Sequence, residues 1–173
     1  LVDPTLALTA GEWEEVLGLK DTPREKYLLL YFLGEVSAEF MEKAEAFAKE
    51  KGLKIVSAHI KGGLGEKNDF SPVDFVSLIR DAEYMFTDSF HGVAFSINFN
   101  TPFYAFARQN SENDTNTVVK SRITSILEIV GLESRLVGEF PESPEKISFE
   151  AVNAVLEKER EKVSAFVKSA TGR

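Results

Sequence analysis

Four residues that could form a ligand site lie together at Asp88, Ser89, His91 and Gly92. Ser89 is predicted to cap the start of a helix. This places His91 in the first turn, where free main-chain N–H groups and the helix dipole favour an anion. An imidazole exchanges protons near neutral pH, so His91 is the candidate catalytic acid or phosphate ligand. The alternative is that His91 only forms a hydrogen bond within the turn, and these residues alone leave both open.

A serine hydrolase is a different interpretation of the same residues, and their spacing disfavours it. Asp88, Ser89 and His91 lie within four residues, which leaves no Asp for the far side of the imidazole. No Gly-x-Ser-x-Gly elbow surrounds the serine either. The plainer roles are a helix cap for Ser89 and, for Asp88, a group that positions the backbone or a sugar hydroxyl.

Two arginines could complete an anion site, because a planar guanidinium can bind a carboxylate or a phosphate through two hydrogen bonds. Arg108 follows an expected strand, and Arg122 is expected in the first turn of a helix. Both can therefore lie at the sheet edge that carries His91. Each could instead be an ordinary surface charge. His59, at the end of another expected strand, is a weaker candidate.

The composition argues against several other kinds of site. Two His and no Cys disfavour a transition-metal centre, and no acidic cluster marks a site for Mg²⁺. We therefore expect neither a metal nor a cofactor. The formal net charge of −8 disfavours nucleic acid as a partner, since a phosphate backbone needs a basic face.

The surrounding elements alternate between apolar strands and amphipathic helices, which predicts an α/β fold with a Rossmann-like, doubly wound parallel sheet. The expected strands are 27–33, 53–57, 84–87, 103–106 and a marginal one at 135–138. The expected helices start at or just after Thr9, Ser37, Ser71, Ser89, Ser121 and Ser148. Right-handed crossovers favour the strand order 2-1-3-4-5. Its switch point, where ligands of such sheets bind, then lies beside Asp88.

Three connecting segments lack a clear helix or strand pattern. Residues 1–8 are predicted to be an extended connector because they open on an Asp-Pro pair. Residues 59–69 hold three glycines but lack the Lys-Ser/Thr of a phosphate-binding loop, so a flexible surface loop is favoured over a substrate loop. Residues 107–120 are polar and longer than most connections, hence either mobile or functional.

A chain of 173 residues, 43% of them hydrophobic, suits one globular domain. We expect a linker with a short helix at 1–26, a Rossmann-like domain at 27–147 and an amphipathic helix at 148–173. No apolar run approaches the ~20 residues of a membrane span. The lack of Cys fits a reducing compartment. Because the chain starts at Leu1 without Met, we expect a piece of a longer protein.

Four short motifs carry a family resemblance: Thr87-Asp88-Ser89-Phe90-His91-Gly92, Leu1-Val2-Asp3-Pro4-Thr5, Ser121-Arg122-Ile123 and Gly131-Leu132-Glu133. Over roughly residues 1–138 the chain resembles the C-terminal half of the polysaccharide pyruvyl transferase family. The resemblance implies one lobe of a glycosyltransferase-B-like fold. It also implies a donor-binding half that would be inactive without its missing N-terminal lobe.

The implied reaction moves pyruvyl from phosphoenolpyruvate onto two hydroxyls of a glycan or lipid-linked sugar, in bacterial cell-surface polysaccharide biosynthesis. His91 would then be the catalytic residue. The substrate-binding residues would be Asp88, Ser89, Gly92, Arg108, Ser121 and Arg122. The implied location is the cytoplasm, with the inner face of the membrane as a second possibility. The alternatives are the donor lobe of a nucleotide-sugar glycosyltransferase and a non-catalytic module that binds sugar or protein.

Overall fold

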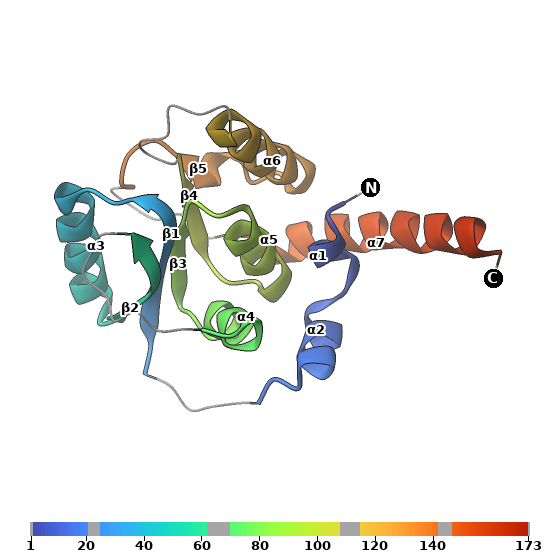
Figure 1. The fold of residues 1–173 in the computed structure, drawn as a ribbon, viewed down its shortest axis with the longest axis horizontal. Coiled ribbons are helices and arrows are strands. Elements are labelled where there is room, and N and C mark those ends of the chain that lie inside the picture. Colours follow the sequence, from blue (N-terminus) through green and yellow to red (C-terminus); the bar gives the residue numbers. More distant parts are fainter. Residues whose placement is uncertain (1, 21–24, 62–69, 108–114, 142–146, 173) are drawn as a thin grey trace.

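A computed structural model describes residues 2–20, 25–61, 70–107, 115–141 and 147–172, and for 59–61 and 115–121 it describes the main chain only. The chain is an α/β domain around a parallel sheet of five strands in the order β2-β1-β3-β4-β5 (Figure 1). The predicted fold class and strand order are therefore confirmed. None of the described helices is long and apolar enough to cross a membrane.

The strands are β1 (Tyr27–Glu35), β2 (Lys54–Lys61), β3 (Tyr84–Thr87), β4 (Phe103–Phe106) and β5 (Leu136–Val137). The helices are α1 (Pro4–Ala7), α2 (Ala10–Leu17), α3 (Ala38–Lys51), α4 (Pro72–Arg80), α5 (Phe90–Phe99), α6 (Thr115–Val130) and α7 (Phe149–Thr171), with a 3-10 turn η1 at Glu133–Arg135.

Alternate residues of the strands pack into two hydrophobic clusters, one on each face of the sheet. In β1, Leu28 and Leu30 pack with α3, whereas Tyr27 and Leu29 pack with α4, α5 and α6. Figure 1 shows α3 on one side of the sheet and α4 and α5 on the other. Because the central strands are covered on both faces, their sequences are continuously apolar. These strands hold the start of α5 at the carboxyl edge of the sheet.

Local end signals explain where most helices begin and end. Ser37, Ser71 and Ser89 each accept a hydrogen bond from a main-chain N–H in the first turn of the helix that follows. Gly52 and Asn100 end α3 and α5 in the left-handed conformation. Their own N–H groups then donate to carbonyl groups in the last turn of each helix. These helices match the predicted ones closely.

The prediction of an extended connector at residues 1–8 is wrong. Asp3 caps α1 by accepting a hydrogen bond from the Thr5 N–H at 3.0 Å, and Pro4 takes the first helical position, where its missing N–H costs nothing. Leu6 is fully buried in the core. The Asp-Pro pair is therefore a helix start and not a linker signal.

Two further boundaries differ from the prediction by more than two residues. Strand β2 continues to Lys61, through residues predicted to be loop, because the long strand β1 offers pairing partners opposite His59 and Ile60. Helix α6 begins at Thr115 and not at Ser121. Its first residues have weak helix propensity, but a helix anchored further along by packing can extend backward, since each added residue gains a main-chain hydrogen bond.

Candidate functional site

The corner after β3 lies at the topological switch point of the sheet. Strands β1 and β3 are neighbours, and the chain leaves them toward opposite edges of the sheet. Asp88 follows β3 and is almost fully buried. Its Oδ1 accepts a hydrogen bond from the Leu33 N–H at 2.7 Å, and its Oδ2 accepts one from the Gly34 N–H at 2.8 Å. Of the two roles considered for Asp88, this carboxylate performs backbone positioning.

Buried hydroxyl groups form the rest of the corner. The Thr87 hydroxyl donates to the Tyr31 carbonyl at 2.7 Å and accepts from the Ser89 N–H at 3.0 Å. The Ser89 hydroxyl accepts from the Gly92 N–H at 3.4 Å, as expected for a helix cap. A Cβ added to Gly92 would lie 2.7 Å from the Thr87 hydroxyl oxygen. Gly92 therefore lets α5 approach β3 closely.

His91 lies in the first turn of α5, as predicted, and is exposed to solvent. Its ring forms a T-shaped pair with the neighbouring Phe90 ring, with 5.5 Å between centroids. Phe90 itself is buried. The imidazole is thus the accessible polar side chain of a corner whose other polar side chains are buried and occupied by main-chain groups.

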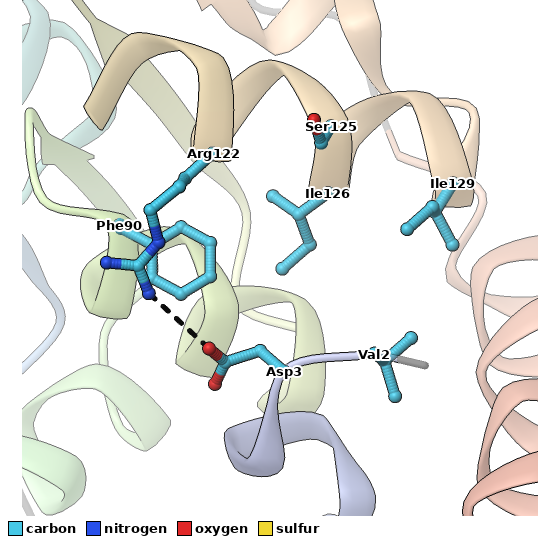
Figure 2. Close-up of a pocket in the computed structure, with 7 residues that line it drawn as sticks. All are labelled: Val2, Asp3, Phe90, Arg122, Ser125, Ile126 and Ile129. Carbon is cyan, nitrogen blue, oxygen red and sulfur yellow. Dashed lines mark hydrogen bonds and ion pairs between the residues drawn. The ribbon is translucent and has the colours of Figure 1, made fainter. Parts of the chain in front are cut away.

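A pocket of about 280 Å³ lies beside this first turn, between α1, α5 and α6 (Figure 2). Its lining residues are Val2, Asp3, Phe90, Arg122, Ser125, Ile126 and Ile129. The guanidinium of Arg122 stacks on the Phe90 ring, 3.9 Å from the ring centroid. Its Nη2 lies 3.5 Å from Asp3 Oδ2, the contact drawn as a dashed line. One side of the pocket is charged, and the Val2, Ile126 and Ile129 side is apolar.

Arg122 reaches this position from an unexpected part of its helix. Arg122 is predicted in the first turn of a helix, but α6 starts at Thr115, so Arg122 lies about two turns into α6. The long side chain nevertheless carries the guanidinium to Phe90 at the start of α5. The predicted neighbourhood of Arg122 and His91 therefore arises through packing between helices.

Asp3 is a charged residue of this site that was not among the predicted site residues. Burial raises the pKa of Asp3, but the hydrogen bonds from Thr5 and the positive charges of His91 and Arg122 outweigh burial, so the pKa of Asp3 lies below its ordinary value. The Asp3 carboxylate therefore stays ionised beside the Arg122 guanidinium. The available signal was the Asp-Pro helix start, which fixes the direction of the Asp3 side chain.

The other predicted site residues are placed less fully. Arg108 lies outside the described residues. Ser121 lies on α6, one residue before Arg122, in the part of the helix whose side chains are not described. His59 belongs to β2 and pairs with Tyr31 of β1. The structure therefore places Arg122 and Asp3 beside the first turn of α5, which carries His91, whereas the Asp88 carboxylate faces the end of β1.

The fold and the corner define a Rossmann-like domain with an accessible imidazole and a guanidinium at the carboxyl edge of its sheet. A family model described as polysaccharide pyruvyl transferase matches residues 1–110. The chain therefore belongs to the polysaccharide pyruvyl transferase family, and the family resemblance is confirmed. The matched region contains Asp3 and the whole Asp88–Gly92 corner, and it ends before Arg122. No curated protein matches the chain.

Proposed function

We propose that this domain is the donor-binding part of a pyruvyl transferase, which takes pyruvyl from phosphoenolpyruvate and transfers it to a pair of sugar hydroxyls as a cyclic ketal. The observation that carries the proposal is the grouping of His91, Arg122 and the first turn of α5 in a member of this family. Free N–H groups of a first turn and a guanidinium are both complementary to an anion.

The chemistry of the pocket fits this donor. Phosphoenolpyruvate carries a phosphate and a carboxylate on a short carbon skeleton that ends in a methylene group. Arg122 and the start of α5 supply donors for the anionic groups. Val2, Ile126 and Ile129 supply an apolar wall for the carbon skeleton.

The reaction adds both sugar hydroxyl oxygens to C2 of the donor and breaks the bond from C2 to the phosphate oxygen. The methylene carbon takes up one proton, and the released phosphate takes up the other. His91 is the exposed group at the corner that can carry a proton, so we assign it the role of acid or phosphate ligand. Arg122 stabilises the negative charge of the donor and of the leaving phosphate.

An NMR titration tests the proposal. Phosphoenolpyruvate is added to the protein while the ring signals of its two histidines are followed. We expect the His91 signals to shift and saturate and the His59 signals to stay in place. Arg122→Ala should weaken binding by about 1.5 kcal/mol, the lower end for a hydrogen bond to a charged group, because Arg122 is 47% exposed.

The control variant is Lys168→Ala, which removes an exposed cation near the far end of α7 and should leave binding unchanged. A parallel titration uses a nucleoside diphosphate sugar. Saturable binding of that sugar at His91, with no response to phosphoenolpyruvate, would favour a glycosyltransferase donor lobe. Unchanged affinity in both Arg122→Ala and His91→Asn would contradict the site.

A further inference from the structure

Residues 2–8, which we call the strap, lie across helices α5 and α7 (Figure 1). The strap contains α1, and its Leu6 is fully buried. A single turn of helix leaves its carbonyl groups without partners inside the helix. The strap carbonyls instead accept hydrogen bonds from side chains far away in the sequence, so distant elements decide where the strap lies.

Asn98 and Arg160 form a latch on these carbonyls. The Asn98 amide Nδ2 donates to the carbonyls of Thr5 and Leu8, each at 3.0 Å. Arg160 donates from Nε to the Leu6 carbonyl at 3.0 Å and from Nη2 to the Leu8 carbonyl at 3.3 Å. Arg160 Nη2 also donates to Asn98 Oδ1 at 3.0 Å, which joins the two latch residues.

Arg160 lies in line with the buried residues of α7 and is itself partly buried. Val152 and Leu156 are buried on one face of α7, and Arg160 continues the same face with a spacing of four residues. Burial lowers the pKa of Arg160, against the opposing charges of Glu12 and Glu157. Moving a guanidinium out of water costs free energy unless hydrogen bonds compensate for the lost hydration. The hydrogen bonds to the strap supply this compensation for Arg160.

The other end of the strap lies at the candidate site. Asp3 precedes α1 directly and places its carboxylate beside Arg122 and within the electrostatic reach of His91. Asn98, near the last turn of α5, bonds the strap, and Phe90, in the first turn, lines the same pocket as Val2 and Asp3. The latch and the site are therefore connected by one short segment of chain.

We propose that Asn98 and Arg160 are positioning residues that hold Asp3 against Arg122, where the carboxylate acts as an internal competitor of the anionic ligand. The inference rests on the proposed anion site and adds a control on its affinity. A ligand anion must share or displace a carboxylate that already faces the same guanidinium. Release of the strap should therefore strengthen anion binding, whereas a purely structural defect would weaken it.

The single tryptophan gives a measurement of the strap that needs no ligand. Trp13 Nε1 donates to the Thr5 carbonyl at 2.9 Å, so its indole N–H signal in an NMR spectrum reports whether the strap is docked. Arg160→Met removes three hydrogen bonds and should move this signal. Arg160→Lys should restore it in part. The control Phe166→Ser, at an exposed position of α7, should not move it.

Binding of inorganic phosphate tests the connection to the site. Asp3→Asn keeps a side chain that can cap α1 but removes the charge. It should strengthen phosphate binding about twofold to fivefold, the size of a surface charge interaction. Arg160→Met should also strengthen phosphate binding, by an amount no larger than that seen for Asp3→Asn. The double variant should bind no more tightly than Asp3→Asn, because both changes act through the same carboxylate.

The outcomes separate this inference from the proposed function. If the unmodified protein binds phosphate at His91 but Asp3→Asn binds it no more tightly, the competitor role of Asp3 is wrong. If Arg160→Met moves the Trp13 signal without changing phosphate affinity, the latch does not act on the site. If neither the unmodified protein nor Asp3→Asn binds phosphate, the proposed function and this inference both fail.

Discussion

At the scale of single residues, the corner after β3 separates side chains that build the site from side chains that can meet a ligand. Asp88, Thr87 and Ser89 are buried, and each bonds a main-chain group. His91 is exposed and Arg122 is partly exposed. The motif therefore contains residues with two different physical roles. Replacement of a buried residue should lower the stability of the domain, whereas replacement of His91 or Arg122 should mainly affect ligand binding.

We expect Asp88→Asn to lower the free energy of unfolding by about 1–3 kcal/mol, because an amide can accept only one of the two N–H groups that the carboxylate holds. Denaturant unfolding measures the difference. Glu45→Gln, an exposed change on α3, serves as the control and should stay within about 0.5 kcal/mol. Equal stability of the two variants would show that the hydrogen bonds of Asp88 contribute little.

At the scale of elements, the approach of α5 to β3 depends on one position without a side chain. An added Cβ at Gly92 would lie 2.7 Å from the methyl carbon of Met85 and 2.7 Å from the Thr87 hydroxyl. The methionine end can move aside. The hydroxyl cannot move as easily, since it is held by the Tyr31 carbonyl and the Ser89 N–H.

Gly92→Ala should therefore destabilise the domain by about 1–3 kcal/mol, the usual cost of overpacking a filled core. Thermal unfolding provides the measurement. Gly11 is a matched control, because it also lies in the first turn of a helix but has nothing within 4 Å of an added Cβ. We expect Gly11→Ala to be neutral or slightly stabilising. A similar response at both glycines would contradict the close-approach explanation.

At the scale of the whole molecule, α7 is divided into a packed part and an exposed part. Val152 and Leu156 belong to the core cluster formed with α4, α5 and α6. Further along the helix, Phe166 and Val167 are 55% and 49% exposed. Figure 1 shows α7 extending beyond the rest of the domain. The apolar face of the predicted amphipathic helix is therefore buried along only part of its length.

Leu156→Ala should cost about 2–5 kcal/mol of stability, because the side chain is fully buried and its removal leaves a cavity. Phe166→Ala removes more carbon atoms from the same helix but should change stability by less than about 0.5 kcal/mol. Equilibrium unfolding of both variants tests the division. A large loss at Phe166 would mean that the exposed part of α7 contributes to folding.

The sequence by itself determined the parts of this protein that depend on neighbours along the chain. Ser37, Ser71 and Ser89 mark helix starts because each hydroxyl accepts a hydrogen bond from the N–H of the third residue after it, so the signal is local in the sequence. Continuously apolar strands alternating with helices required a parallel sheet, and the handedness of its crossovers selected the strand order. The position of the Asp88 corner was predicted from this strand order, because Asp88 follows the strand at its switch point.

The tertiary structure alone decided which distant residues meet. Asp3 and Arg122 lie far apart in the sequence. They come together in space only because α1 and α6 pack beside the start of α5. Arg160 lies on a helix rich in charged residues, and only the fold brings it to the carbonyl groups of Leu6 and Leu8. Such contacts form after long loops have closed, and the geometry depends on the packing of the whole core, which no local pattern records.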